Sequence, residues 1–178
     1  MQTRTDEEVV AEVGEAEKGL VIERRFTTAG SDPFDAFEWI EMSVEIRNPD
    51  GSLAHEIQGV QLPSGFAGVP GKVCAQKYLR KAGVPAVLRK VVEDGVPGWL
   101  QRSEPDHEKL QTLAPEDRFV GETHGRELFR RLAGTWTYWG WTHGYFASEA
   151  DARSFYDEMC YLIASQKSAP NSPQWFNT

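Results

Sequence analysis

The last nine residues contain the most specific candidate for chemistry, a bend between two prolines. Pro170 and Pro173 flank Asn171 and Ser172, and the proline rings fix the backbone there. A rigid bend of this kind presents a hydroxyl and N–H groups outward, an arrangement that suits an anion such as a phosphate. The same residues are also typical of a turn that leads from a helix end into a strand. The residues alone leave both interpretations open.

A dense aromatic segment is the second candidate: Trp136-Thr137-Tyr138-Trp139-Gly140-Trp141. Because an indole N–H needs a partner when it is buried, so many aromatic residues in one place indicate a specific role. We favour a packed aromatic wall that joins two helices, with a stacking platform for a base or a macrocycle as the alternative. The basic pairs Arg80-Lys81 and Arg130-Arg131 are interpreted as solvated helix faces.

Other residues that could do chemistry are poorly spaced for it. Cys74 and Cys160 form no CxxC pair, which excludes a zinc knuckle or a vicinal redox pair within this chain. Each lies in an apolar helical pattern and is predicted to be a small buried hydrophobe, with a radical or redox thiol as the alternative. The four histidines are scattered, so no metal site is predicted. A glycine-rich stretch fails the P-loop spacing, because five residues separate Gly65 from Gly71 and Val73 follows the lysine.

Period-two patterns in the first third of the chain predict a small antiparallel meander or hairpin over residues 20–62. Apolar and polar residues alternate over 20–26, except that Arg24 falls on the apolar face. Over 40–47 the alternation has no exception, with Ile40, Met42, Val44 and Ile46 on one face. The sequence Asn-Pro-Asp-Gly at 48–51 predicts the turn. Residues 55–62 are predicted to form the second strand of the hairpin, and Gly59 within it indicates a bulge.

Helical patterns dominate the rest. The first predicted helix spans 72–82, with a Gly and a Pro after its last turn. An irregular connection is expected over 84–122. The second helix spans about 124–133 and stops at Gly134. The third is capped by Ser148, with Asp151 three residues later, and ends before Pro170.

The composition fits a folded domain rather than a nucleic-acid or membrane protein. The chain has 178 residues, of which 40% are hydrophobic, and its 19 Lys and Arg against 27 Asp and Glu give a net charge of −8. That balance argues against a nucleic-acid binder, and no apolar run reaches the length of a membrane span. The first 18 residues carry six acids against two bases and predict a solvated tail rather than a targeting signal, so a cytoplasmic location is expected.

Five segments of the chain resemble the class II ribonucleotide reductases, the adenosylcobalamin-dependent enzymes that make deoxyribonucleotides. The more specific segments are LAGTWTYWGW, EADARSFYDEMCYLIASQ and SAPNSPQWFNT, in this order. The others, ERRFTTAGSDPFDAFEW and AQKYLRKAGVP, are similar to that family's N-terminal region. The resemblance covers about residues 20–178.

The resemblance implies a large enzyme built on a ten-stranded α/β barrel, in which cobalamin initiates thiyl radical chemistry on a substrate ribose. Two further cysteines are recycled by thioredoxin or a similar reductant. All three cysteines are expected beyond Thr178, so this chain contains no catalytic residue and is expected to be inactive alone. Adenosylcobalamin is expected to be bound mainly by the barrel. In the family the Ser or Thr before the motif's proline contacts the substrate phosphate, which implies Ser172 as a substrate-binding residue, together with the backbone of Asn171 and Pro173.

These considerations predict an α+β fold, a small antiparallel sheet followed by a mainly helical part. The expected organisation is an acidic disordered tail at 1–19, the N-terminal domain of a ribonucleoside-diphosphate reductase at 20–169, and the truncated start of the barrel at 170–178. Expected partners are a ribonucleoside diphosphate, a thioredoxin-like reductant and the remaining barrel, with no membrane and no nucleic acid. Trp175 and Phe176 are expected to be exposed, and burial of Trp175 in the core would weaken the interpretation as a fragment. The alternative is a free-standing non-catalytic subunit or adaptor that docks on a separately encoded barrel.

Overall fold

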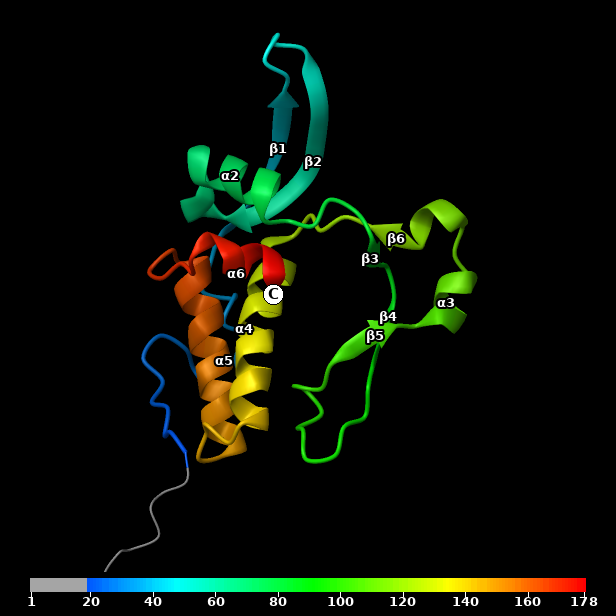
Figure 1. The fold of residues 1–178 in the computed structure, drawn as a ribbon. Helices are drawn as coiled ribbons and strands as arrows, with labels where there is room; N and C mark the ends of the chain where they lie inside the picture. Colours follow the sequence, from blue (N-terminus) through cyan, green and yellow to red (C-terminus); the bar gives the residue numbers. More distant parts are fainter. Residues whose placement is uncertain (1–18) are drawn as a thin grey trace, which may run out of the picture.

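The computed structural model describes residues 19–178, and the predicted acidic tail therefore lies almost entirely outside the described residues. Figure 1 shows a helical body, a β-hairpin that projects from one end of it, and an arm of short elements at its side. The mixture of helices and small antiparallel sheets confirms the predicted α+β class. No helix among the described residues is both long and apolar enough to cross a membrane.

The projecting hairpin consists of β1 (Trp39–Arg47) and β2 (Leu53–Pro63), paired antiparallel. Its turn is closed by the N–H of Gly51, which donates to the carbonyl of Asn48 at 2.9 Å. The register changes between Met42 and Val44, opposite Gly59 at φ +67°. The predicted hairpin, turn and bulge are thus confirmed, because alternating burial and turn chemistry both act locally here.

The predicted strand over residues 20–26 is wrong except at its first residue. Leu20 forms an isolated bridge with Phe146, while the following segment runs irregularly along α5 (Glu149–Ala164). Its backbone N–H groups find side-chain acceptors in place of a strand, since Ile22 donates to Asp151 at 2.8 Å and Thr27 to Glu158 at 2.9 Å. Carboxylates on α5 therefore satisfy the donors that a sheet would have used.

Helix α2 (Val69–Lys77) follows the 3₁₀ turn η1 (Ser64–Phe66) and occupies the glycine-rich stretch. It begins three residues earlier and ends five residues earlier than the predicted helix 72–82. Gly71 is required by packing, because a Cβ there would lie 2.7 Å from the Met42 sulfur. Tyr78 is the C-cap of α2, and two residues later the carbonyl of Arg80 accepts from the N–H of Glu122 at 2.7 Å, outside the helix.

The connection predicted to be irregular contains several short elements that form the arm in Figure 1. Two antiparallel pairs build it, β3 with β6 and β4 with β5. The elements are β3 (Val84–Pro85), β4 (Leu88–Lys90), β5 (Ser103–Pro105), α3 (His107–Gln111), η2 (Pro115–Asp117) and β6 (Phe119–Val120). The segment between β4 and β5 returns to the helical body, where Glu93 and Gly95 accept hydrogen bonds from Tyr138 and Trp141 of α4.

Helices α4 (Gly125–Thr142) and α5 lie side by side and form the body. The predicted cap of α5 is confirmed, because the Ser148 hydroxyl accepts from the N–H of Asp151. The predicted stop of α4 at Gly134 is wrong: the helix continues through Gly134 and Gly140 and contains the aromatic segment. Although glycine disfavours a helix interior by about 1 kcal/mol, Gly140 allows the ring of Phe146 to approach, where a Cβ would be only 2.7 Å away.

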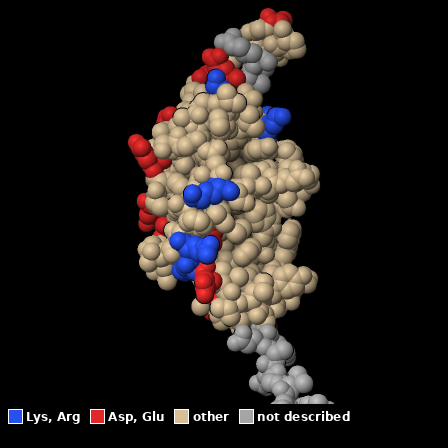
Figure 2. All heavy atoms as spheres, turned by 90° about the vertical axis from the view of Figure 1, so that its left-hand side faces the viewer, with Lys and Arg blue, Asp and Glu red and all other residues tan. Residues whose placement is uncertain are grey.

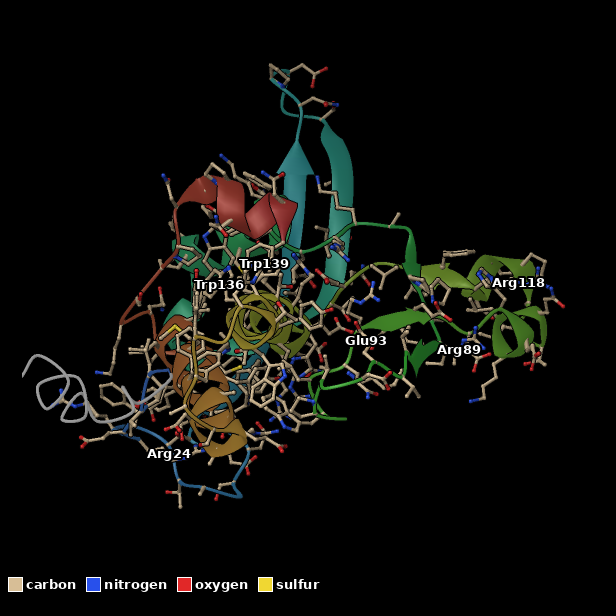
Figure 3. All side chains as sticks on the ribbon, turned by 60° about the horizontal axis from the view of Figure 1, so that its bottom comes forward. Arg24, Arg89, Glu93, Arg118, Trp136 and Trp139 are labelled. Carbon is tan, nitrogen blue, oxygen red and sulfur yellow. The ribbon has the colours of Figure 1, made fainter. Side chains whose placement is uncertain are left out.

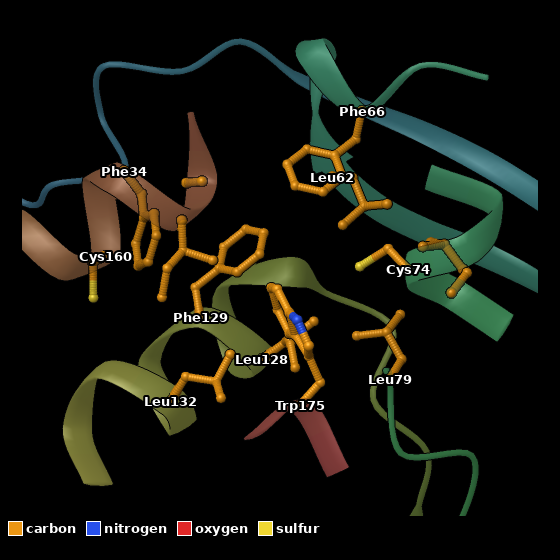
Figure 4. Close-up of a cluster of buried hydrophobic side chains, with 14 of the residues drawn as sticks. Phe34, Leu62, Phe66, Cys74, Leu79, Leu128, Phe129, Leu132, Cys160 and Trp175 are labelled. Carbon is orange, nitrogen blue, oxygen red and sulfur yellow. The ribbon is translucent and has the colours of Figure 1, made fainter. Parts of the chain in front are cut away.

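The core lies where α4, α5, the base of the hairpin and α2 meet (Figure 4). Phe34, Leu62, Leu128, Phe129 and Leu132 are fully buried in it. Trp175 from α6 (Ser172–Asn177) belongs to the same cluster. On the face of the molecule in Figure 2, uncharged side chains predominate and the charged ones lie mainly near one edge.

Candidate functional site

The predicted bend lies at the start of α6, on the surface. Asn171 is the N-cap residue, and its side-chain oxygen accepts from the N–H of Ser172 at 2.9 Å. The carbonyl of Asn171 accepts from the N–H of Gln174 at 3.0 Å. Pro173 stands in the first turn of α6, where a proline is tolerated because its missing N–H would be unpaired there. The structure thus places Asn171, Ser172 and Pro173 together in one capped turn.

The groups that the bend offers to a ligand differ in part from those predicted. The N–H of Ser172 is already bonded to Asn171, and Pro173 has none, so these two positions contribute no free backbone donor. The Ser172 hydroxyl is exposed and has no hydrogen-bond partner within residues 19–178. A hydroxyl can donate to a phosphate oxygen. The bend therefore offers a serine side chain rather than a cradle of N–H groups, and its role in binding stays a prediction.

Trp175 is buried beneath the bend, so the expectation that it is exposed is wrong. Only 6% of its surface is accessible, against 54% for Phe176, which is exposed as expected. The indole stacks on Tyr78 with ring centroids 4.7 Å apart, and its N–H donates to the carbonyl of Pro170 at 3.1 Å. The hydrophobic effect explains this packing, because Tyr78 and the core residues around it offer an apolar place for the indole. Because Trp175 is buried, it does not provide the exposed apolar surface that the interpretation as a fragment predicted, and that interpretation loses this support.

An ion pair below α6 holds its other end. The Arg131 guanidinium donates to both carboxylate oxygens of Glu122, at 3.1 and 3.0 Å. It also donates to the carbonyl of Thr178 at 2.7 Å and to that of Tyr78 at 3.3 Å. The Arg131 side chain is only 12% exposed, so its interpretation as part of a solvated face is wrong. Its position three residues after buried Leu128, on the same helical face, is the sequence signal that could have revealed it.

The aromatic side chains of residues 136–141, within α4, form hydrogen bonds to the segment between β4 and β5 and to α6. The Tyr138 hydroxyl donates to Glu93 at 2.7 Å, and the indole N–H of Trp141 donates to the carbonyl of Gly95, also at 2.7 Å. The indole of Trp136 donates to the Gln174 side chain at 3.2 Å. Figure 3 labels Trp136 and Trp139 on α4, and Glu93 on the segment between β4 and β5. These contacts agree with the predicted wall, although the wall joins α4 to a loop and to α6; Trp139 alone is half exposed.

The Tyr138–Glu93 hydrogen bond also perturbs both groups. It raises the pKa of Tyr138, because the phenol proton is held by a carboxylate, and it lowers the pKa of Glu93. Arg102 contacts the same carboxylate at 3.0 Å. The arrangement is an anchor rather than an acid–base pair, because each perturbation favours the state that the pair already has at neutral pH.

Both cysteines are buried, as predicted. Burial raises the pKa of Cys74 to about 12, helped by the negative charge of Glu122, and burial raises the pKa of Cys160 to about 12 as well. Since the thiolate is the reactive form, neither residue is suited to redox chemistry at neutral pH. His124 is the N-cap of α4 and His143 lies at the other end of that helix. No cluster of metal-ligating side chains occurs among residues 19–178.

Comparison with known proteins gives a consistent assignment. Residues 40–166 match the family described as class II vitamin B12-dependent ribonucleotide reductase, a range that ends before the bend. The vitamin B12-dependent ribonucleotide reductase of Bradyrhizobium diazoefficiens is 51% identical over 157 residues, which are 88% of this chain and 12% of the relative.

More distant relatives agree with this assignment. The protein of the same name from Agrobacterium fabrum is 49% identical over 88% of this chain and 12% of its own length. The one from Streptomyces avermitilis is 32% identical over 92% of this chain and 14% of its own length. The chain thus spans only about an eighth of the length of these relatives. Because the family model covers residues 40–166 and a relative is 51% identical over 88% of the chain, the chain belongs to the class II vitamin B12-dependent ribonucleotide reductase family.

Proposed function

We propose that this chain is the N-terminal part of a ribonucleoside-diphosphate reductase, which makes deoxyribonucleotides for DNA synthesis. The observation that carries the proposal is the 51% identity to a vitamin B12-dependent ribonucleotide reductase over 88% of the chain. Because the chain spans 12% of that relative, the activity proposed is that of the whole protein. The burial of Cys74 and Cys160 supports a location of the redox cysteines outside these residues, and hence the inactivity of this part alone.

We propose further that the bend at Asn171–Pro173 contacts the phosphate of the substrate, chiefly through the hydroxyl of Ser172. Two features support this role. The hydroxyl is exposed and unpaired among the described residues, and the turn that carries it is fixed by the Asn171 cap. Because the backbone turn that carries the hydroxyl is already ordered, little conformational entropy of the backbone is lost on binding, and more of the hydrogen-bond energy contributes to affinity.

The family depends on cobalamin, and we propose that the adenosyl form is the cofactor of the whole enzyme. A cavity of about 930 Å³ lies between α4, α5 and residues 30–33. Its polar side chains are already paired: Arg130 with Asp32 at 2.7 Å, and Trp99 with Glu149 at 2.9 Å. Arg153, also in the cavity, lies over the ring of Trp99. The charged side chains of this cavity are thus engaged within the chain, which supports our proposal that the cofactor is held mainly by the rest of the protein.

The same proposal names the expected partners of the whole enzyme. These are a ribonucleoside diphosphate as substrate, a thioredoxin-like protein as reductant, and the catalytic barrel that the remaining sequence of the relatives would form. We place the enzyme in the cytoplasm, where its substrate is formed.

The experiment compares Ser172→Ala with Ser168→Ala in the full-length enzyme. Ser168 is a matched control, because it is also an exposed serine in the segment after α5. A hydrogen bond to a charged group contributes on the order of 1.5–3 kcal/mol. We therefore expect S172A to raise KM for the diphosphate by about tenfold or more with little change in kcat, because uniform binding is lost. A fall in kcat at unchanged KM, or an equal effect of S168A, would contradict the proposed contact.

A further inference from the structure

Arg131 contacts the segment that carries the bend from the opposite side. Its guanidinium donates to the carbonyl of Thr178 at 2.7 Å and to that of Trp175 at 3.5 Å. Arg131, on α4, therefore connects residues 175–178 to a different element of the fold.

Glu122 fixes the orientation of this guanidinium. The carboxylate and the guanidinium meet through two hydrogen bonds, and the side chains are 5% and 12% exposed. Glu122 also accepts from the N–H of Arg80 at 2.8 Å, so its own position is set by the backbone after α2. A bidentate pair in a largely buried place holds a planar group in one orientation.

The geometry of α6 transmits this orientation to the bend. Ser172 begins the helix, and the carbonyl groups of Trp175 and Thr178 that Arg131 binds follow within two turns. Trp175 connects the two ends, because its indole N–H donates to Pro170 while its carbonyl accepts from Arg131. A rotation of α6 about the buried indole would move the Ser172 hydroxyl, and the contacts of Arg131 oppose that rotation.

We propose that Arg131, oriented by Glu122, is a positioning residue for phosphate binding by the bend. This inference rests on the proposed function, since it takes Ser172 to be the group that contacts the phosphate. Arg131 itself is not a ligand of the phosphate: its N–H groups are occupied by Glu122 and by backbone carbonyls, on the buried side of α6. The positive charge thus acts on the substrate only through the placement of the serine.

The test uses the full-length enzyme with four variants: Arg131→Gln, Arg131→Lys, Ser172→Ala and the double variant R131Q/S172A. Arg130→Gln is the matched control, because Arg130 is the next residue on α4, is 48% exposed and pairs with Asp32, away from α6. Two quantities are measured: hydrogen exchange of the amides of residues 172–178, and KM and kcat for the ribonucleoside diphosphate.

For R131Q we expect amide exchange in residues 172–178 to accelerate and KM to rise by about tenfold, with kcat within about twofold. R131K retains a charge but lacks the bidentate geometry, so its KM should lie between those of R131Q and the unchanged enzyme. The double variant should have nearly the KM of S172A alone, because residues that act through one contact are not additive. The control R130Q should change neither quantity.

Each outcome separates the two proposals. Unchanged exchange in R131Q would refute the anchoring of α6 by Arg131, whatever S172A does. An unchanged KM in S172A would refute the serine contact, and exchange in R131Q would still report whether α6 is anchored. A double variant whose KM is the product of the two single effects would overturn the positioning role, because Arg131 would then act independently of Ser172. If R131Q does not fold, Glu122→Gln replaces it, since it retains one acceptor but removes the charged bidentate pair.

Discussion

Trp175 and Phe176 are adjacent in one short helix and offer a direct test of the packing of α6. Trp175 is 6% exposed and stacks on Tyr78, whereas Phe176 is 54% exposed. Truncation of a fully buried tryptophan costs about 3–5 kcal/mol. Because α6 lies at the edge of the core and can shift, we expect W175A to lower the free energy of unfolding by about 3 kcal/mol. We expect F176A to lower it by less than about 1 kcal/mol.

The assay is urea unfolding of the 178-residue chain, followed by far-ultraviolet circular dichroism, because tryptophan fluorescence would itself change in W175A. Hydrogen exchange of residues 172–177 distinguishes two routes to the loss. If α6 detaches locally, its amides exchange rapidly while those of α4 and α5 stay protected. In that case the decrease in the free energy of unfolding equals the free energy with which α6 docks. Equal losses in W175A and F176A, within about 0.5 kcal/mol, would refute the assignment of Trp175 to the core.

Two further predictions concern titratable groups. Burial alone would raise the pKa of Glu158, but the hydroxyl and N–H of Thr27 and the N–H of Phe26 donate to it and leave its pKa below the ordinary 4.5. Its contribution to stability is therefore complete above about pH 4.5 and is lost as the pH falls through the lower folded-state value. E158Q should reduce the free energy of unfolding by about 1–3 kcal/mol at pH 7 and flatten its dependence on pH between 3 and 5; an unchanged acid slope would contradict this. Cys74 and Cys160, with pKa values of about 12, should resist iodoacetamide at pH 7.5 in the folded chain and react in urea; modification at equal rates in both states would show that they are not buried.

Elements set by local chemistry could be predicted from the sequence. The hairpin of β1 and β2 follows from period-two alternation and an Asn-Pro-Asp-Gly turn, and the start of α5 follows from the Ser148 cap. Where distant segments compete, the local signals were misleading. Gly134 indicates a helix stop locally, yet α4 continues through it and packs there against Tyr156 of α5. Tertiary contacts outweigh a propensity difference of about 1 kcal/mol.

The candidate site divides in the same way. Ser172 and its neighbours could be identified because their motif is contiguous, whereas the long-range contacts that hold them could not. Arg131 donates to the carbonyl groups of Trp175 and Tyr78, which are 44 and 53 positions away in the sequence. Tyr78 and Trp175, which stack on each other, are also far apart in the sequence. No spacing in the sequence encodes such contacts. The burial of Trp175 in particular involves its stacking on Tyr78, the C-cap residue of α2.

Acidic side chains accept hydrogen bonds from the irregular backbone of a chain with little sheet; Glu158 and Glu122 are buried and Asp151 is partly buried. Glu158 accepts the N–H groups of Phe26 and Thr27, Asp151 accepts that of Ile22, and Glu122 accepts that of Arg80. Each carboxylate thus accepts the backbone N–H groups that would otherwise bond to the carbonyl groups of a neighbouring strand. Asp157, only 1% exposed, meets Arg24 at 2.8 Å and so holds the same N-terminal segment through its side chain. Part of the net charge of −8 is therefore structural rather than a property of the surface. Substitution of these acids should release whole segments, and Glu122 is the one whose loss would reach the bend.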